Sequence, residues 1–378
     1  MQQSEPKKIP SFLKKILSSA VETLFVPLLA VLTAVVLGGI VIAVVGGNPF
    51  MAYIGLVQGS FGSIKALSET AVWATPYIFA GLAVAVAFKG GLFNIGAEGQ
   101  LALGAVVAAL IGYALPGWLG FDLPAIIHIP LAVLLGALAG ALWAAIPGAL
   151  KAYTGGHEVI NTIMMNYIAF RLVDWLLKFP MKDPNEFTPK TPWILETAKL
   201  PRFFDTPIRF HLGFFIAILM AVVVYLLLFK TTWGFELRMV GSNPNAARYA
   251  GVKITKTTVL AMVLSSALAG MAGANEVLGI NYRLLPAFSS GYGFDSIALA
   301  LLGKTHPLGV ILSSLLFGFL RNGARSMQLA VGVPIDIVSI LQALILAFIA
   351  APAIIRTIYR LKESKHKEQL VSLTSWKG

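Results

Sequence analysis

Residues 89–104 read Lys-Gly-Gly-Leu-Phe-Asn-Ile-Gly-Ala-Glu-Gly-Gln-Leu-Ala-Leu-Gly, a glycine-rich and polar stretch between two long apolar runs. Its polar side chains, Asn94, Glu98 and Gln100, would be costly in contact with lipid, so they must face protein or a water-filled cavity. The glycines permit close backbone approach or an unwound turn. The stretch therefore predicts an irregular turn inside a bundle of membrane helices.

The composition of the whole chain also indicates a membrane protein. Of its 378 residues, 57% are hydrophobic and only 12% are charged, and the mean hydropathy is +0.80. Soluble proteins carry roughly 25% charged residues, so this chain has too little charge to cover a soluble globule. The net charge of +12 does not indicate binding to nucleic acid, because the basic residues lie between apolar runs, as at the cytoplasmic ends of membrane helices.

Apolar segments long enough to cross a bilayer recur along the chain. A hydrocarbon core about 30 Å thick requires roughly 20 mostly apolar residues per helix. We therefore expect an all-α, polytopic membrane protein with about ten transmembrane helices, at residues 24–46, 71–89, 92–114, 125–149, 158–179, 212–230, 257–280, 294–303, 307–323 and 334–355. The segment 294–303 is too short to cross alone, and it can form a re-entrant hairpin with 307–323, hinged at residues 305–307.

Basic residues at the two ends of the chain predict its orientation. Lysines occur in residues 1–23, before the first apolar segment, and lysine and arginine recur in residues 357–378 after the last one. Basic residues beside membrane helices favour the cytoplasm, so we expect both tails there and a single transmembrane domain over residues 24–356. An even number of crossings then places the loop 180–211 outside and the loop 231–256 in the cytoplasm, although the two loops carry similar numbers of basic residues.

Two polar stretches are candidates for a transport path. Besides residues 89–104, the segment 286–295 is rich in glycine and serine and opens the short helix. Broken helices of this kind often mark the substrate site of a transporter. For Glu98 we weigh two interpretations equally: a role in transport, and a structural carboxylate bonded to neighbouring backbone or to Gln100.

Other polar and small residues in the spans favour a structural interpretation. Arg171 and Asp174 lie three residues apart in one expected helix and can neutralise each other. We favour a structural role for the neighbours Asn275 and Glu276 as well. The glycines and alanine of 136–140 and 270–274, spaced four residues apart, are typical of closely packed helices.

The chain lacks the motifs of catalysis and metal binding. It has no cysteine, which excludes disulfides, thiolate metal sites and cysteine nucleophiles. Residues 303–305 resemble the end of a phosphate-binding loop, but Ala298 stands where that loop requires glycine. The five histidines are scattered. We expect no enzyme, no metal and no cofactor in this chain, so any ATP must be hydrolysed by another subunit.

Three segments, in the same order along the chain, resemble a known family of transport proteins. They are residues 90–101 (GGLFNIGAEGQL), 155–169 (GGHEVINTIMMNYIA) and 234–251 (GFELRMVGSNPNAARYAG). They are similar to the ABC-transporter permeases for simple sugars, nucleosides and branched-chain amino acids, and most similar to the nucleoside-uptake permeases. The resemblance implies a ten-helix importer permease in the cell membrane, with a second permease subunit in a heterodimer, ABC ATPase subunits and an extracellular or periplasmic substrate-binding protein.

The third segment also has the composition of a short helix. Asn243 or Asn245 can cap its start, Pro244 suits the first turn, and Gly251 can end it. An ordinary connecting loop is the alternative. The resemblance implies that this helix docks on the ATPase as a coupling helix, with coupling residues Asn243, Ala246, Ala247, Arg248 and Gly251.

The sequence thus predicts the permease of an ATP-driven importer for nucleosides, working by alternating access. A nucleoside is neutral and polar with a flat base, so asparagines and aromatic side chains can serve its path. The candidate residues of the substrate path are Asn94, Glu98, Gln100, Asn161 and Asn166. One alternative is an importer permease for a simple sugar. Another is an ion-coupled secondary transporter, with Glu98, Asp174 or Glu276 as the proton carrier.

Overall fold

The computed structural model describes residues 11–350 and 352–360, and this part of the chain is helical, with an isolated antiparallel bridge between Arg202 and His211. The expected all-α fold is confirmed. The α-helices are α1 (Ser11–Val44), α2 (Pro49–Phe61), α3 (Ile64–Lys89), α4 (Ala97–Leu119), α5 (Ala125–Ala149), α6 (Glu158–Lys178), α7 (Gly213–Lys230), α8 (Thr232–Ser242), α9 (Pro244–Tyr249), α10 (Ile254–Glu276), α11 (Tyr292–Leu302), α12 (Pro307–Val331), α13 (Ile337–Ala350) and α14 (Pro352–Ile358). Short turns of other helix types are η1 (Leu150–Thr154), η2 (Glu196–Ala198) and η3 (Val277–Asn281).

The chain divides into two compact units. The main unit, residues 53–330, holds α3 to α11 and nearly all of α12. In the other unit α1 packs against α13 and α14, and the hydroxyls of Thr33 and Tyr359 form a hydrogen bond of 2.9 Å. Every candidate site residue lies in the main unit.

The lengths and compositions of six helices suit a membrane crossing. These are α3, α4, α5 with η1, α7, α10 with η3, and α12. The other four expected spans differ from these six. Helix α6 is long enough but contains four charged residues, Glu158, Arg171, Asp174 and Lys178, and helices α11 and α13 are short. The apolar part of α1 is long enough to cross a membrane only together with α2, and the two are bent by 117°. The structure thus supports a polytopic membrane protein, and the count of ten stays a prediction.

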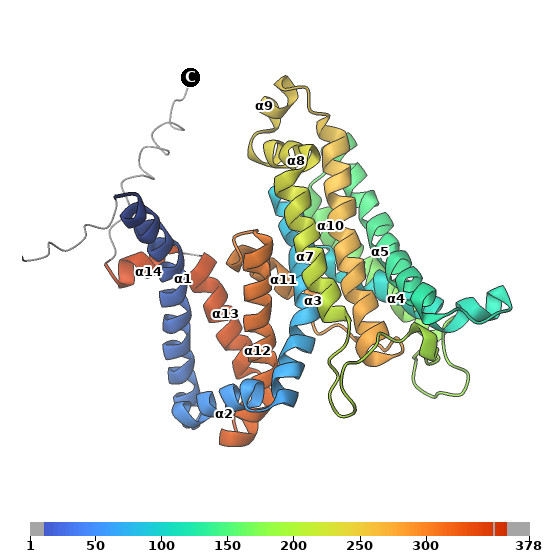
Figure 1. Cartoon of the computed structure of the whole chain (residues 1–378), viewed down its shortest axis with the longest axis horizontal. Coiled ribbons are helices and arrows are strands. Elements are labelled where there is room, and N and C mark those ends of the chain that lie inside the picture. Colours follow the sequence, from blue (N-terminus) through green and yellow to red (C-terminus); the bar gives the residue numbers. More distant parts are fainter. Residues whose placement is uncertain (1–10, 351, 361–378) are drawn as a thin grey trace, which may run out of the picture. The chain divides into compact units, whose positions relative to one another are not determined.

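Helix α10 forms the centre of the main unit, packed against α3, α4 and α5 (Figure 1). Small residues make this packing possible. A Cβ atom on Gly270 would collide with the backbone of Gly136, and one on Gly104 would collide with Gly270 itself. The role in close helix packing that was predicted for Gly136 and Gly270 is confirmed.

Between α3 and α4 the backbone forms the irregular turn predicted from the sequence. Helix α3 ends at Lys89, Gly91 adopts a positive φ of 71°, and α4 begins only at Ala97. The expected span 92–114 is therefore displaced towards the C-terminus. The turn approaches α8 closely, because a Cβ atom on Gly91 would lie 2.9 Å from the Cα of Gly241.

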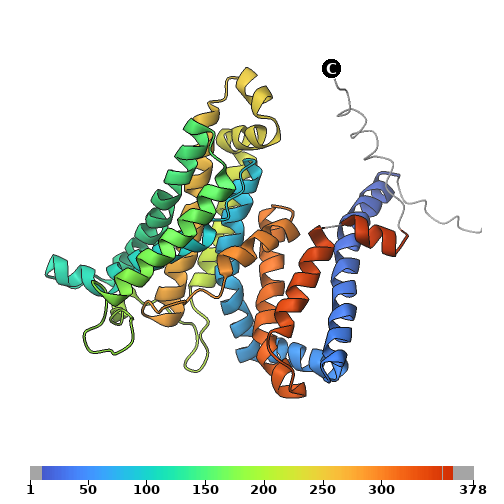
Figure 2. The same ribbon diagram turned by 180° about the vertical axis from the view of Figure 1, so that it is seen from behind.

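The two long loops lie at opposite ends of the main unit. Helices α8 and α9 cover one end, and the 180–211 loop lies at the other (Figures 1 and 2). The loop is irregular but fixed: Leu195 N–H donates to Gly112 O and Leu200 N–H donates to Leu278 O, both at 2.9 Å. The predicted orientation places these two loops on opposite sides of the membrane, and their positions at opposite ends of the main unit agree with it.

The short helix α11 and the start of α12 form a hairpin. Between them Lys304 and Thr305 adopt positive φ values of 52° and 53°. Gly303 and Gly309 let the two arms approach, and Ser313 Oγ donates to Leu299 O at 2.9 Å. The hinge thus lies where the sequence placed it, and α11 is as short as expected.

Single cysteines test the predicted orientation, because the chain contains none. Phe187 in the 180–211 loop is 98% exposed, and Tyr249 at the end of α9 is 95% exposed. We expect a membrane-impermeant maleimide to label Phe187→Cys in intact cells, and Tyr249→Cys only after the cells are opened. The reverse labelling pattern would show that the orientation is inverted.

Candidate functional site

Asn94 ties the turn between α3 and α4 to the neighbouring helices. Its amide and that of Gln100 exchange two hydrogen bonds of 3.0 Å, and Asn94 Nδ2 also donates to Ser265 Oγ in α10 at 3.0 Å. Ser265 in turn donates to Ala83 O in α3 at 2.7 Å. Asn94 and Gln100 are each only 1% exposed. A fully bonded network of this kind fixes the positions of the turn and the three helices around it.

Asn166 in α6 holds the same turn from the other side. Its Oδ1 accepts from Gly99 N–H and its Nδ2 donates to Ile95 O, both at 2.9 Å. Asn161 lies instead beside Gly156, half-buried in the first turn of α6, five residues or about 7.5 Å of helix before Asn166. The structure thus brings four of the five expected path residues together around one turn.

Glu98 lines a cavity of about 260 Å³. Its carboxylate accepts hydrogen bonds from Ser289 Oγ and, at 2.5 Å, from Gly293 N–H at the start of α11. Backbone N–H groups in the first turn of a helix have no partners within the helix, and a carboxylate there is favourable. The structural interpretation of Glu98 is therefore supported, but its partners are Ser289 and Gly293, since Gln100 bonds to Asn94.

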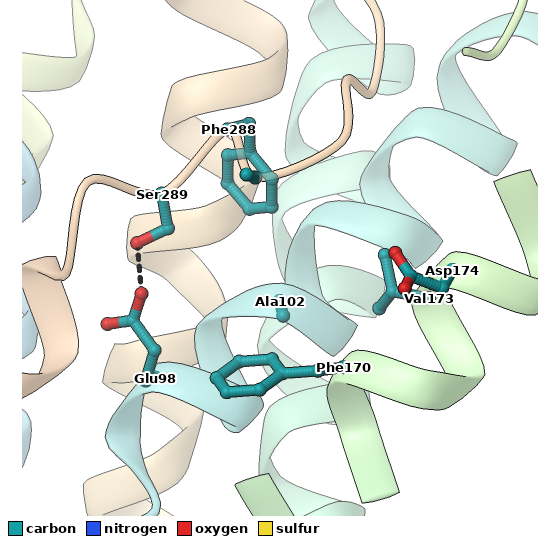
Figure 3. A pocket seen from close by; sticks show the side chains of 8 residues that line it. Glu98, Ala102, Phe170, Val173, Asp174, Phe288 and Ser289 are labelled. Atoms are coloured by element: carbon teal, nitrogen blue, oxygen red, sulfur yellow. Dashed lines mark hydrogen bonds between the residues drawn. The ribbon is translucent and has the colours of Figure 1, made fainter. Parts of the chain in front are cut away.

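The cavity beside Glu98 has aromatic and acidic walls (Figure 3). In this view the Glu98–Ser289 pair lies on one side, Val173 and Asp174 lie on the other, and the rings of Phe170 and Phe288 lie between them. The lining residues are Glu98, Ala102, Phe170, Val173, Asp174, Ala287, Phe288 and Ser289. Of the candidates predicted for a substrate path, the cavity thus contains Glu98.

The expected pairing of Arg171 with Asp174 is not among the ion pairs of the described residues. Arg171 is exposed, and Asp174 lines the cavity. Residues three apart on a helix lie on the same face and can touch. They need not do so, because each side chain can also adopt a rotamer that points away from the other.

A polar cluster missed at the sequence level joins α3, α11 and α12. Tyr77 Oη donates to Asp295 Oδ2 at 2.8 Å, and Arg321 Nη2 donates to the same oxygen at 3.1 Å. Arg321 Nε also donates to Tyr77 Oη at 3.1 Å. These residues carry no common motif, and Tyr77 lies 218 positions from Asp295, so only the folded chain reveals the cluster.

The predicted helix in the 231–256 loop is present as α9. Asn243 caps it, with Ala246 N–H donating to Asn243 Oδ1 at 3.1 Å, and Pro244 occupies the first turn. Gly251 follows with a positive φ of 83°. Ala247 is fully buried, whereas Ala246 and Arg248 are exposed. Helix α9 therefore presents most of its surface outward at one end of the main unit.

Helix α8 connects α9 to the polar turn. It begins at the cap residue Thr231, and its last turn packs against the backbone of residues 89–91, where a Cβ atom on Gly241 would collide with Lys89 O. Leu237 of α8 is fully buried and lies beside Gly90. Helix α8 thus lies in direct contact with both α9 and the start of the turn that Asn94 and Asn166 hold.

Comparisons with known proteins agree with this architecture. A model of the family described as branched-chain amino acid transport system / permease component matches residues 66–351. No solved structure matches the chain.

Three curated relatives match nearly the whole chain. The guanosine ABC transporter permease protein NupP of Bacillus subtilis is 43% identical over 340 residues, covering 89% of this chain and 95% of the relative. The glucose ABC transporter permease protein TsgB13 of Haloferax volcanii is 36% identical, covering 85% and 86%. The nucleoside ABC transporter permease protein NupB of Lactococcus lactis subsp. cremoris is 35% identical, covering 88% and 92%.

Proposed function

Since the chain belongs to the branched-chain amino acid transport system / permease component family, we propose that it is the permease subunit of an ATP-driven importer of nucleosides. It is an integral membrane protein of the cell membrane and a transport component rather than an enzyme. The observation that carries the substrate class is the 43% identity to a guanosine permease over 95% of that relative, supported by a second relative named for nucleosides.

An ABC permease works with ATPase subunits and a substrate-binding protein. In our proposal ATP is bound and hydrolysed in the ATPase subunits, and this chain needs no cofactor of its own. The exposed helix α9 is the proposed docking point, with Asn243, Ala246, Ala247, Arg248 and Gly251 as the coupling residues. A second permease, expected to be a different chain, completes the membrane part. Ten crossings would result if α1, α6, α11 and α13 complete the six long apolar helices.

The proposed mechanism starts at α9. Closure of the ATPase pair moves α9, and α8 carries the movement to residues 89–91 through the contact between Gly241 and Gly91. Because Asn94 and Asn166 bind the following turn to α10 and α6, the turn moves with these helices rather than deforming alone.

The movement next reaches the cavity through Glu98. This residue lies in the first turn of α4 and binds Ser289 and the start of α11. A shift of α4 therefore also shifts one wall of the cavity. In alternating access, such a shift opens the cavity towards one side of the membrane and closes it towards the other.

A simple sugar is the second candidate substrate, because TsgB13 is named for glucose and is 36% identical to this chain. Purification of the intact complex decides between the two. We expect ATPase subunits, a second permease and a binding protein to co-purify, and the binding protein to bind guanosine in preference to glucose. Preference for glucose would replace the nucleoside by a sugar, and a complex without an ATPase would refute the importer.

Removal of the helix cap tests the role of α9. Asn243→Ala deletes the oxygen that accepts from Ala246 N–H, a loss of about 1 kcal/mol of helix stability. We expect uptake to fall severalfold at unchanged expression. Asn243→Ser keeps a capping oxygen and should stay close to the wild-type rate. Equal rates for all three proteins would show that the cap does not matter for transport.

A further inference from the structure

The main unit contains a second cavity, of about 130 Å³, and Arg209 of the 180–211 loop contributes to its lining. It is lined by the first half of α3, the end of α10 with η3, Arg209, the segment before α11 and the first residue of α11. The lining residues are Val72, Trp73, Arg209, Glu276, Ile280, Asn281, Phe288, Ser290 and Tyr292. Resting on the proposed nucleoside transport, we propose that this cavity binds the nucleobase of the substrate and that Glu276 accepts a hydrogen bond from an N–H group of that base.

Glu276 lines this cavity and has a buried carboxyl oxygen without a hydrogen-bond partner in the described part of the chain. The residue is only 3% exposed, and its Oε1 has no hydrogen-bond partner among the described residues. An unpartnered buried polar group costs about as much as a lost hydrogen bond, so a ligand that supplies a donor gains affinity there. A carboxyl group keeps an acceptor oxygen in either protonation state, and every common nucleobase carries an N–H donor on its edge.

The structural role favoured for Asn275 and Glu276 is not realised as a hydrogen-bonded pair. Both amide atoms of Asn275 also lack partners among the described residues. Asn275 lies instead beside Gly213 and His211, whereas Glu276 lines the cavity. Glu276 is therefore not paired with Asn275, and the basic side chain that shares the cavity with it is Arg209.

Arg209 is held in place at the cavity by another residue. Its guanidinium forms a bidentate ion pair with Glu69 in α3, in which Nε lies 3.0 Å from Oε1 and Nη2 lies 2.5 Å from Oε2. In this geometry Glu69, not Glu276, accepts the hydrogen bonds of the arginine. The ion pair fixes the rim of the cavity and leaves Glu276 available to a ligand.

The walls of the cavity suit a flat ring. Trp73 and Tyr292 lie with their ring centroids 6.4 Å apart and inclined by 56°, and Phe288 adds a third aromatic side chain. Every nucleobase is planar and can stack on an aromatic ring, whichever base it is. A free sugar presents hydroxyls on most sides and would find fewer partners on such walls, so the base of the nucleoside is the better fit.

The second cavity adjoins the path proposed beside Glu98. Phe288 lines both cavities, and the next two residues divide between them: Ser289 lines the first and Ser290 the second. Arg321 Nη2 donates to Ser290 O at 3.3 Å and so helps to fix this common wall. A base held near Glu276 would therefore be separated from the cavity beside Glu98 by this common wall.

The test measures binding of tritiated guanosine to the purified complex in lipid nanodiscs, without the binding protein. We expect saturable binding that free guanine displaces and ribose does not. Glu276→Leu removes the acceptor and should raise Kd about tenfold, the factor expected for one lost hydrogen bond to a buried acceptor. Glu276→Gln keeps an acceptor oxygen and should bind within about threefold of the wild type. Glu196→Gln, in the 180–211 loop and 85% exposed, is the matched control and should bind as the wild type does.

A structural role for Glu276 would give different results. Replacing an unpartnered buried carboxyl by leucine should leave the melting temperature of the empty complex unchanged or raise it, whereas a lower melting temperature would refute the site. Wild-type affinity in Glu276→Leu, displacement by ribose but not by guanine, or no binding by the wild type would refute it too. Cellular uptake separates the two claims: if the wild type imports guanosine, the proposed function stands even when the base site fails, and if it imports none, both fail.

Discussion

Replacing Ala247 with proline is expected to abolish ATP-driven uptake while the membrane helices still assemble. Ala247 is fully buried in α9, and its N–H donates to Asn243 O at 3.0 Å. Proline removes this donor and clashes with the preceding turn, at a cost of about 3 kcal/mol, which a six-residue helix cannot withstand. Uptake assays and recovery of the ATPase during purification measure the effect, and we expect both to be lost.

Charge reversal at the next residue tests the same surface without breaking the helix. Arg248 is exposed on α9, so Arg248→Glu should uncouple uptake at normal expression. Lys256→Glu is its control, since Lys256 is also basic and exposed but belongs to α10. Loss in both variants would indicate a general charge effect. Wild-type uptake by a well-expressed Ala247→Pro protein would show that α9 is only a connector.

Glu98→Leu is expected to reduce uptake at least about tenfold. The change leaves Ser289 Oγ and Gly293 N–H without their acceptor, and each buried unpaired donor costs about 1–3 kcal/mol. Glu98→Gln can still accept from Gly293 N–H through its oxygen and donate to Ser289 Oγ, so it should keep most of the activity. Initial uptake rates at matched expression compare the variants.

The comparison of glutamine with leucine also separates two mechanisms. Ser289→Ala removes one of the two partners and should have a smaller effect than Glu98→Leu. If Glu98→Gln and Glu98→Leu are equally inactive, an ionisable carboxyl is obligatory, as a proton carrier requires. That outcome would favour the ion-coupled transporter over the permease.

Local sequence signals predicted the coupling helix well. Each of its signals concerns residues only a few positions apart. As predicted, Asn243 caps α9, Pro244 occupies its first turn, and Gly251 follows its end with a positive φ. The irregular turn of residues 90–96 was predictable for the same reason, because glycines and polar residues cannot continue a lipid-facing helix.

Contacts between distant residues could not be predicted in this way. Ser289 lies 191 positions from Glu98, and Arg209 lies 140 from Glu69, so no local pattern pairs them. The sequence indicated that Glu98 needed a partner, but the partners predicted were neighbouring backbone or Gln100, because only neighbours in the chain can be recognised without the fold.

The number of crossings shows the limit of hydropathy. Helix α6 forms where a span was expected, yet its charged and amide side chains make it less apolar than the six long helices. One of these side chains, Asn166, is bonded inside the protein, where its Nδ2 donates to the backbone of Ile95. A helix that uses polar groups in this way resembles a soluble helix in composition, so counting apolar residues cannot settle its placement.

Uptake by proteoliposomes that contain the purified complex tests the central claim most directly. Tritiated guanosine is supplied with the binding protein on one side and ATP on the other, with and without an ionophore that collapses ion gradients. We predict uptake that requires ATP and the ATPase subunits and is unchanged by the ionophore. Uptake that persists without ATP and disappears when the gradient collapses would contradict the account.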